Sequence, residues 1–484
     1  MRSPLPRHAA AAGSTCNAAA GSTLAILHPT TRYAAVQAVE LRLAAPGAAQ
    51  LAGPWLWRLP ASCSTASGRP ALQQLVGVQA LLVPLARASS FERLLDDLAS
   101  RDPLPAGCRW SLSVAVHGQR SKAARDSDAA RATDYLCAVA QRLAGAPALG
   151  LPGATELRLL RTPRLWYLVE VVAGQEAEGG ALAAVWAARP YSFSASTDLR
   201  LARLAVSVAW LSTRGAAPHG TGGGGGDGGG GGEAAVAGAA VAAGAAAAGA
   251  AASPMMLDPC CGSGTVLYAA ASLGLRAVGC DLNPTAIRGA EQNLRHCGEA
   301  QGWGQAGAPT ALLHDSCAPL PEQAAGVQMV VASLPWGRQQ RIPHEAYLPQ
   351  MLSSLAGQLP GVTFVLLSAD PPTEIVARSG LLPSASAPVS SGAGVRCYLT
   401  IARAPAATAA AVPAATAAAS SSSTTTATTS TAATVILESP QVLHGGGMKG
   451  ADAAAREGRR RPPRAEEEIE VQCRVGTGSE GLTL

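Results

Sequence analysis

The chain has 484 residues, of which only 14% are charged, and a net charge of +5. This length suits two or three domains, and the apolar content excludes a chain that is disordered throughout. The mild positive charge permits an RNA partner without requiring one. Eleven cysteines with no C-x-x-C pair argue against a disulfide framework and against a structural zinc site, so we expect a reducing compartment and no bound metal.

The N-terminal segment, residues 1–22, is rich in Ala and Ser. It contains Arg2 and Arg7, and no acidic residue precedes Glu40. Organelle transit peptides have this composition, and so do Ala-rich disordered tails. The location therefore stays open between the cytoplasm and an organelle, with a nuclear location less favoured.

Residues 23–180 show the periodicities of a small α+β region. Apolar residues at helical spacing predict helices over 89–100 and 128–145, the second ending on Gly145 as a C-cap. Apolar or alternating runs predict strands over 22–28, 79–86, 110–118, 154–160 and 164–172, the last two as a pair.

A lead-in helix is expected over residues 181–213. Two low-complexity segments are also visible, one directly after this helix and one at the end of the chain. The Gly/Ala-rich stretch 214–253 is predicted to be a disordered insertion, and residues 404–484 a disordered tail. The run Ala234–Ala252 is uncharged, but Ala inserts weakly into bilayers, so we expect no membrane span.

Residues 254–403 alternate between short apolar runs and amphipathic helical patterns. This alternation predicts a mostly parallel sheet with helices on both faces. In such a sheet ligands bind beyond the carboxyl ends of the strands. The segment "LDPCCGSGTVLYAAASLGLRAVGCD", Leu257–Asp281, is read as strand, tight turn, helix and strand with a final acid.

The residues of this segment indicate a nucleoside pocket. Gly262 and Gly264 let a ligand approach the backbone, and Asp281 is placed to accept hydrogen bonds from a ribose. No G-K-[ST] follows, and Leu267 stands where a dinucleotide fingerprint needs its third Gly. Asp258 would repel a pyrophosphate but suits an ammonium group, which favours S-adenosylmethionine.

Two later strand ends complete the predicted site. Asp315 is expected to accept a hydrogen bond from an adenine amino group, whereas the neighbouring His314 is expected to pack. The turn Ser333-Leu334-Pro335-Trp336 ends a strand, and its aromatic ring can stack on an unpaired base. Arg338 and Arg341 follow, either as phosphate contacts or as a solvated turn.

These stretches resemble the class I S-adenosylmethionine-dependent methyltransferases, and among them the THUMP-associated RNA guanine-N2 methyltransferases of tRNA or rRNA. "LDPCCGSGT" is similar to that family's first motif and "GCDLNPTAIRGAEQNL" to its second strand and helix. "HDS" resembles its adenine-contacting acid and "SLPWGRQQR" its catalytic turn. More faintly, residues 23–180 look like the ferredoxin-like and THUMP modules that bind RNA.

The resemblance implies a Rossmann-like catalytic domain with a seven-stranded sheet over residues 254–403, behind a THUMP-like RNA-binding region. It implies a cofactor site made of Asp258, Cys260, Gly262, Ser263, Gly264, Thr265, Asp281 and Asp315. It implies a catalytic turn made of Ser333, Leu334, Pro335 and Trp336. Some eukaryotic relatives work with a small zinc-binding activator subunit, which makes such a subunit a candidate partner beside the RNA.

Ser333 departs from the family pattern, which has Asn or Asp at this position. A shorter hydroxyl arm puts the rate and the target base in doubt. Two alternatives to RNA guanine-N2 methylation therefore stay open. One is an RNA-binding paralogue with weak or no activity, and the other is an adenine-N6 or protein-glutamine methyltransferase. A nicotinamide-dependent oxidoreductase is disfavoured by Asp258 and the missing third Gly.

Overall fold

The computed structural model describes residues 23–28, 32–64, 72, 75–100, 103–104, 108–116, 122–143, 146–147, 154–174, 176–192, 196–214, 253–303, 308–335, 344–369, 372–390 and 396–406. The predicted N-terminal segment 1–22, nearly all of the insertion (215–252) and nearly all of the tail (407–484) lie outside these residues. The chain divides into two compact units, with one boundary between Glu176 and Ala177. Residues 35–43 belong to the second unit although they lie early in the sequence.

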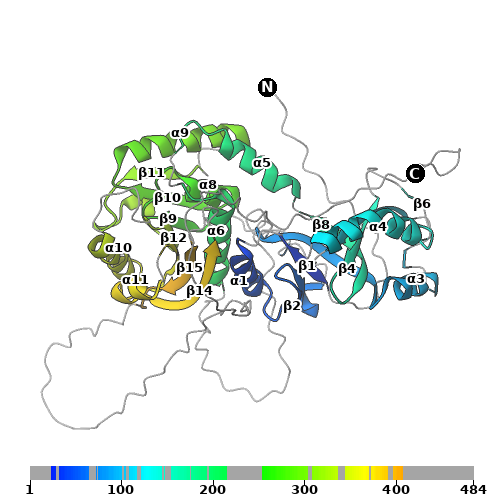
Figure 1. Ribbon diagram of the computed structural model, residues 1–484. Coiled ribbons are helices and arrows are strands. Elements are labelled where there is room, and N and C mark those ends of the chain that lie inside the picture. Colours follow the sequence, from blue (N-terminus) through cyan, green and yellow to red (C-terminus); the bar gives the residue numbers. More distant parts are fainter. Residues whose placement is uncertain are drawn as a thin grey trace, which may run out of the picture. The chain divides into compact units, whose positions relative to one another are not determined.

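The first unit is built on one eight-stranded sheet with the order β2-β3-β1-β4-β8-β7-β5-β6 (Figure 1). The pairs β5–β7 and β5–β6 are parallel and the others are antiparallel. The predicted pairing of the last two strands is confirmed. The strands are β1 (Leu24–Leu27), β2 (Ala49–Ala52), β3 (Leu56–Arg58), β4 (Val78–Ala88), β5 (Arg109–Val116), β6 (Ala146–Pro147), β7 (Thr155–Arg161) and β8 (Trp166–Gly174).

Two helices, α3 (Phe91–Ser100) and α4 (Lys122–Ala140), contribute to a core on one face of this sheet. The rings of Phe91, Tyr135 and Trp166 meet there with centroids 4.7 to 5.0 Å apart. Helix α4 begins earlier than the sequence pattern predicts, and Gly145 lies outside the described residues. The likeness of this unit to THUMP modules stays a prediction.

The second unit holds a seven-stranded sheet with the order β11-β10-β9-β12-β13-β15-β14. The five strands from β11 to β13 are parallel, and β15 is antiparallel to both of its neighbours. The expected number of strands is therefore correct, and the sheet is mixed. Its strands are β9 (Met255–Asp258), β10 (Arg276–Asp281), β11 (Thr310–Leu313), β12 (Val327–Ser333), β13 (Thr363–Ser368), β14 (Leu382–Ser390) and β15 (Arg396–Arg403).

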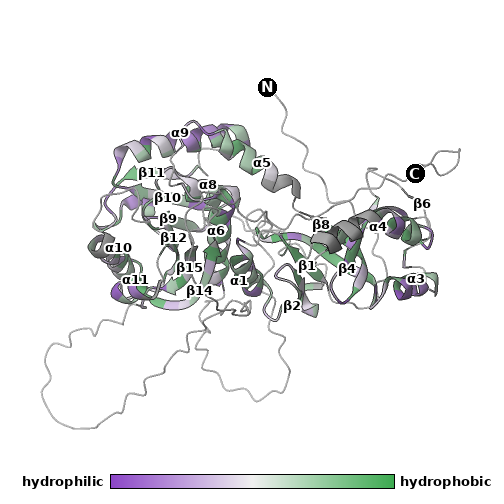
Figure 2. Ribbon diagram, in the orientation of Figure 1, coloured by the Kyte–Doolittle hydropathy of each residue, from purple (hydrophilic) through white to green (hydrophobic). Residues whose placement is uncertain are grey.

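Helices cover both faces of this sheet. Helix α6 (Leu199–Arg214) packs on α8 (Thr265–Ser272), β12 and β13, and α9 (Pro284–Gln301) packs on β10 and β11. On the opposite face α10 (His344–Gln358) and α11 (Pro372–Arg378) join a core of residues such as Leu257, Val330 and Phe364. The central strands are mostly green in Figure 2, whereas α9 carries purple residues.

The predicted single lead-in helix is wrong, because two helices occupy this region. Helix α5 (Glu176–Ala187) ends shortly before Pro190, a residue that disfavours a helical conformation in the residue before it. Helix α6 starts at Leu199, where the Asp198 carboxylate accepts a hydrogen bond from the Leu201 amide at 3.1 Å as an N-cap. A further helix of this unit, α1 (Ala34–Ala44), is linked to α6 by a hydrogen bond from the Ser207 hydroxyl to the Glu40 carboxylate.

The helices of the described part of the chain include none that is long and apolar enough to cross a membrane.

Candidate active site

The tight turn between β9 and α8 is held against the neighbouring strand by its backbone. The Cys261 amide donates to the Cys280 carbonyl at 2.9 Å, and the Gly264 amide donates to the Cys261 carbonyl at 2.9 Å. Gly262 and Gly264 have φ angles of 51° and 85°, in the left-handed region that favours glycine. A Cβ on Gly262 would meet nothing within 4 Å, so the backbone of this turn borders open space.

Asp281 ends β10, and both of its carboxylate oxygens accept backbone hydrogen bonds. Oδ2 accepts from the Gly262 amide at 2.9 Å, and Oδ1 accepts from the Asn283 amide at 2.8 Å. The carboxylate therefore joins the turn after β9 to the start of α9. Each oxygen of an ionised carboxylate has a second acceptor site, so Asp281 still has capacity for a ligand hydroxyl.

Asp258 lies at the end of β9 and is 1% exposed. Burial raises the pKa of its carboxyl to about 8, the hydrogen bond from the Cys260 amide at 3.2 Å opposes this rise, and the charge of Asp281 adds to it. A cation placed beside such a buried carboxyl group would stabilise its ionised form. An ammonium group is thus a better ligand for this position than a phosphate.

Gly279, which the sequence analysis did not single out, lets the turn lie close to β10. A Cβ at this position would lie 2.6 Å from Leu267 Cδ1 and 2.7 Å from Cys261 Cβ. These contacts are too short for any side chain, so the packing of the turn on the strand requires glycine here. The residue pattern alone gave no sign of this requirement, because Gly279 reads as an ordinary small residue in an apolar strand.

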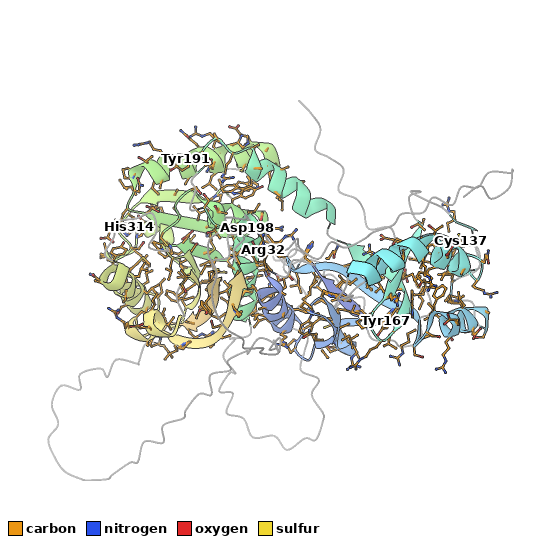
Figure 3. All side chains as sticks on the ribbon, in the orientation of Figure 1. Arg32, Cys137, Tyr167, Tyr191, Asp198 and His314 are labelled. Carbon is orange, nitrogen blue, oxygen red and sulfur yellow. The ribbon has the colours of Figure 1, made fainter. Side chains whose placement is uncertain are left out.

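Asn293 is a second residue that the sequence analysis missed. Its fully buried side-chain amide accepts from the Tyr191 amide at 2.9 Å and donates to the Tyr191 and Ser263 carbonyls at 2.9 and 3.0 Å. The Tyr191 ring lies over Gly289, where a Cβ would be 2.1 Å from it. Figure 3 labels Tyr191 beside α9. Asn293 therefore fixes the segment before α6 to the turn after β9.

The turn after β12 comes close to the turn after β9. The Cys260 thiol donates to the Ser333 carbonyl at 3.5 Å, and the Thr197 hydroxyl donates to the Ser333 hydroxyl at 2.7 Å. The Leu334 amide donates to the Leu367 carbonyl at 2.9 Å, and Pro335 follows half-buried. The other predicted residues of this region, Trp336, Arg338 and Arg341, lie outside the described residues.

Asp315 follows β11 and is exposed, with its Oδ1 accepting from the Cys317 amide at 2.9 Å and the Tyr347 hydroxyl at 3.2 Å. Leu313, two residues before Asp315, is 60% exposed, and Leu282, which follows Asp281, is 46% exposed. Leu313 pairs with Asp281 across the parallel strands β10 and β11. Each of these two neighbouring strand ends therefore carries an acid and an exposed leucine.

The cysteines of the site are not activated nucleophiles. Burial raises the pKa of the Cys260 and Cys261 thiols, and it raises the pKa of Cys280 to about 12. These thiols stay protonated at neutral pH and act as small packing groups. Among the described residues no group of three or more His, Cys, Asp or Glu side chains is arranged to hold a metal ion.

The structure thus brings most of the predicted site residues to one edge of the sheet. Asp258, Gly262, Gly264 and Asp281 are linked around a single turn, and Ser333 contacts that turn through Cys260. Ser263 and Thr265 are both buried, with Thr265 as the first residue of α8. Asp315 lies two residues beyond β11, on a neighbouring strand end. His314 donates its amide to the Asp281 carbonyl at 3.1 Å and is labelled in Figure 3.

Residues 239–362 match the family model of the RMKL-like methyltransferase domain. Similar solved structures include TrmN from Thermus thermophilus, with 17% identity over 79% of this chain and 99% of that chain and a TM-score of 0.41. A SAM-dependent methyltransferase from Methanosarcina mazei shares 16% identity over 32% of this chain and 93% of its own, with a TM-score of 0.26. The magnesium protoporphyrin IX methyltransferase ChlM from Synechocystis PCC 6803, with bound SAM, shares 18% identity over 31% and 71%, with a TM-score of 0.25.

None of the curated proteins compared matches the chain. The family match indicates a methyltransferase domain within the second unit, and it supports S-adenosylmethionine as the cofactor expected from the sequence.

Proposed function

We propose that the chain is an S-adenosylmethionine-dependent RNA methyltransferase that modifies the exocyclic N2 of a guanine in tRNA or rRNA. The observation that carries the proposal is the contact between the two turns. The Cys260 thiol of the turn after β9 reaches the Ser333 carbonyl of the turn after β12 at 3.5 Å. A cofactor on the first turn would therefore have its reactive group beside the second.

The residues present fit this cofactor. Asp258 is a buried acid that gains from a cationic amino group, and Asp281 retains acceptor sites for ribose hydroxyls. Leu282 and Leu313 offer an apolar surface for adenine, with Asp315 at its polar edge. Gly262 presents a bare backbone to the ligand, whereas Gly264 lets the turn lie against Ala290 of α9. When bound, S-adenosylmethionine supplies a methyl group on a sulfonium as the electrophile.

At the acceptor side the chain orients a nitrogen through hydrogen-bond acceptors, and the proton that the methylated amine loses passes to solvent. The carbonyl groups of Ser333 and Leu334 and the Ser333 hydroxyl are acceptors for the N–H groups of an exocyclic amine. Placing the amine in line with the methyl group turns a bimolecular reaction into a step between prealigned groups. Trp336 is the proposed stacking partner of the base, with Arg338 and Arg341 as proposed phosphate contacts. An activator subunit is a further candidate partner. Methyl transfer by the isolated chain would show that such a subunit is not required.

The test is methyl transfer from labelled S-adenosylmethionine to total RNA of the host, followed by nucleoside mass spectrometry. Label in N2-methylguanosine that is lost with Asp258→Ala supports the proposal. Ser384→Ala is a matched control, because the Ser384 hydroxyl bonds the Ile401 carbonyl on the far strands β14 and β15. Label in N6-methyladenosine or in protein would show that the target is adenine or a protein and not guanine N2. Cofactor binding without transfer, even with the activator subunit added, would favour the inactive RNA-binding alternative.

A further inference from the structure

The short segment before α6 contacts both turns of the candidate site through two neighbouring hydroxyl groups. The hydroxyl oxygens of Ser196 and Ser263 lie 2.7 Å apart, and the Thr197 hydroxyl donates to the Ser333 hydroxyl at 2.7 Å. Ser263 belongs to the turn after β9 and Ser333 ends β12. We call Ser196 and Thr197 the hydroxyl clasp, because adjacent residues hold two turns that are far apart in sequence.

The hydroxyl clasp stands on a rigid support. Asp198 follows it directly and caps α6, with its carboxylate accepting from the Leu201 amide at 3.1 Å and its carbonyl accepting from the Ala202 amide at 2.9 Å. Helix α6 is buried along most of its length, with nine residues in the core. A cap on a buried helix leaves the preceding residues little freedom, so the clasp can set the positions of the groups that it bonds.

The bond from Thr197 defines what Ser333 can offer to a substrate. A serine hydroxyl has one hydrogen and two acceptor sites. Thr197 donates to one acceptor site, which leaves the second acceptor site and the hydrogen. The rotation of the Ser333 side chain is restrained at the same time. Ser333 is shorter than the Asn or Asp expected at its position, so a neighbour that aims it has a large effect on where its oxygen points.

We propose that Thr197 is a positioning residue that aims the Ser333 hydroxyl at the acceptor nitrogen, while Ser196 holds the cofactor turn through Ser263. The inference rests on the proposed function. The hydroxyl clasp then sets the separation between the methyl donor and the acceptor group. Substitutions of Thr197 and of Ser196 should therefore have different effects on ligand binding, because Thr197 acts on the acceptor side and Ser196 on the cofactor side.

The test compares two probes by calorimetry on the full chain. S-adenosylhomocysteine fills the cofactor site without a methyl group. Sinefungin carries an amine on a carbon in place of the sulfonium methyl, so its amine reports on acceptors at Ser333. We expect Thr197→Val to lower the ratio of sinefungin affinity to S-adenosylhomocysteine affinity by about 3- to 10-fold, the range of one ordinary hydrogen bond, because the variant misaligns the acceptor without removing it. Affinity for S-adenosylhomocysteine itself should stay within about twofold, the scatter of a distant change.

Control variants separate positioning from a loss of structure. Thr197→Ser keeps the hydroxyl and should restore the ratio. Ser196→Ala should weaken both probes by the same factor. Thr213→Val removes a hydroxyl that bonds the Trp210 carbonyl at 2.7 Å near the other end of α6, and should change neither probe. In a Ser333→Ala background, Thr197→Val should have no further effect on the ratio.

The outcomes distinguish the two proposals. If the wild type binds both probes and Thr197→Val leaves their ratio unchanged, the inference is overturned and the proposed function stands. Equal weakening of both probes by Thr197→Val would also overturn it, because that is the result of a structural role. If the wild type binds neither probe, the proposed function fails and the inference fails with it.

Discussion

Asn293 on α9 and Tyr191 before α6 form a reciprocal pair of hydrogen bonds, although they are 102 residues apart in sequence. The Tyr191 amide donates to Asn293 Oδ1 and Asn293 Nδ2 donates to the Tyr191 carbonyl, both at 2.9 Å. A third bond links Nδ2 to the Ser263 carbonyl at 3.0 Å. One buried amide thus joins a segment that precedes residues 215–252 to a turn that follows them.

Asn293→Ala should destabilise the second unit and weaken cofactor binding together. It removes three hydrogen bonds of a buried side chain and leaves the Tyr191 amide and two carbonyls without these partners. We expect a loss of about 2–4 kcal/mol in the free energy of unfolding, measured in urea. Asn283→Ala, which removes the exposed N-cap of the same helix, should cost about 1 kcal/mol. Equal costs for the two variants would contradict the role given to Asn293.

Gly279→Ala should displace the turn after β9. The added Cβ would lie 2.6 Å from Leu267 and 2.7 Å from Cys261, so the turn or the helix behind it must move. We expect a loss of about 1–3 kcal/mol in unfolding free energy and weaker binding of S-adenosylhomocysteine. Gly357→Ala is the matched control, since a Cβ in that helix meets nothing within 4 Å. That control should be neutral or stabilising by up to about 1 kcal/mol.

Asp258 should make the stability of the ligand-free protein fall as the pH rises. Its pKa in the folded chain is about 8, above its ordinary value of 3.8, so the folded state keeps a proton that the unfolded state loses. This contribution is fully present below pH 4 and is lost as the pH rises towards 8, by at most about 1.4 kcal/mol per pH unit. Asp258→Asn keeps an acceptor for the Cys260 amide and should flatten this dependence in urea unfolding. An unchanged slope would show that Asp258 is ionised in the folded chain.

The same carboxyl should make cofactor binding depend on pH in the opposite direction. An ammonium ligand needs the ionised form, so affinity for S-adenosylhomocysteine should rise between pH 6 and pH 7.5. The affinity should rise by up to about tenfold per pH unit, as expected when binding is coupled to the release of one proton. Over this range the ligand's own amino group stays protonated, so the slope reports on Asp258. Asp258→Asn should bind more weakly and with no such slope, and a wild type without the slope would refute the role of Asp258.

Asp281→Asn should weaken cofactor binding more than it affects folding. The change replaces one of two acceptor oxygens by a donor, which then faces the amide of Gly262 or of Asn283. It also removes acceptor sites for ribose hydroxyls. We expect at least about tenfold weaker binding of S-adenosylhomocysteine, the value of one lost charged hydrogen bond. Asp198→Asn, which keeps a side-chain oxygen to cap α6, should retain wild-type affinity.

The local pattern of the sequence was sufficient for the order of elements from β9 to β10 and for the acids at strand ends. A short apolar run, a glycine turn, a helix and a second run ending on Asp281 can form one kind of unit, because each element is set by neighbouring residues. It also predicted that Gly262, Gly264 and Ser333 lie at the carboxyl-end edge of the sheet. It failed at the lead-in region, where Pro190 and the Asp198 cap divide the expected helix into α5 and α6.

Tertiary structure alone decided which residues support the site. Asn293, Gly279 and the hydroxyl clasp act through partners up to 136 residues away, and no local periodicity encodes such a contact. The raised pKa of Asp258 likewise depends on the layers packed over it, since burial and not residue type penalises its charge. The sequence determined the chemistry available at each strand end, whereas packing between segments on either side of residues 215–252 determined how those groups meet.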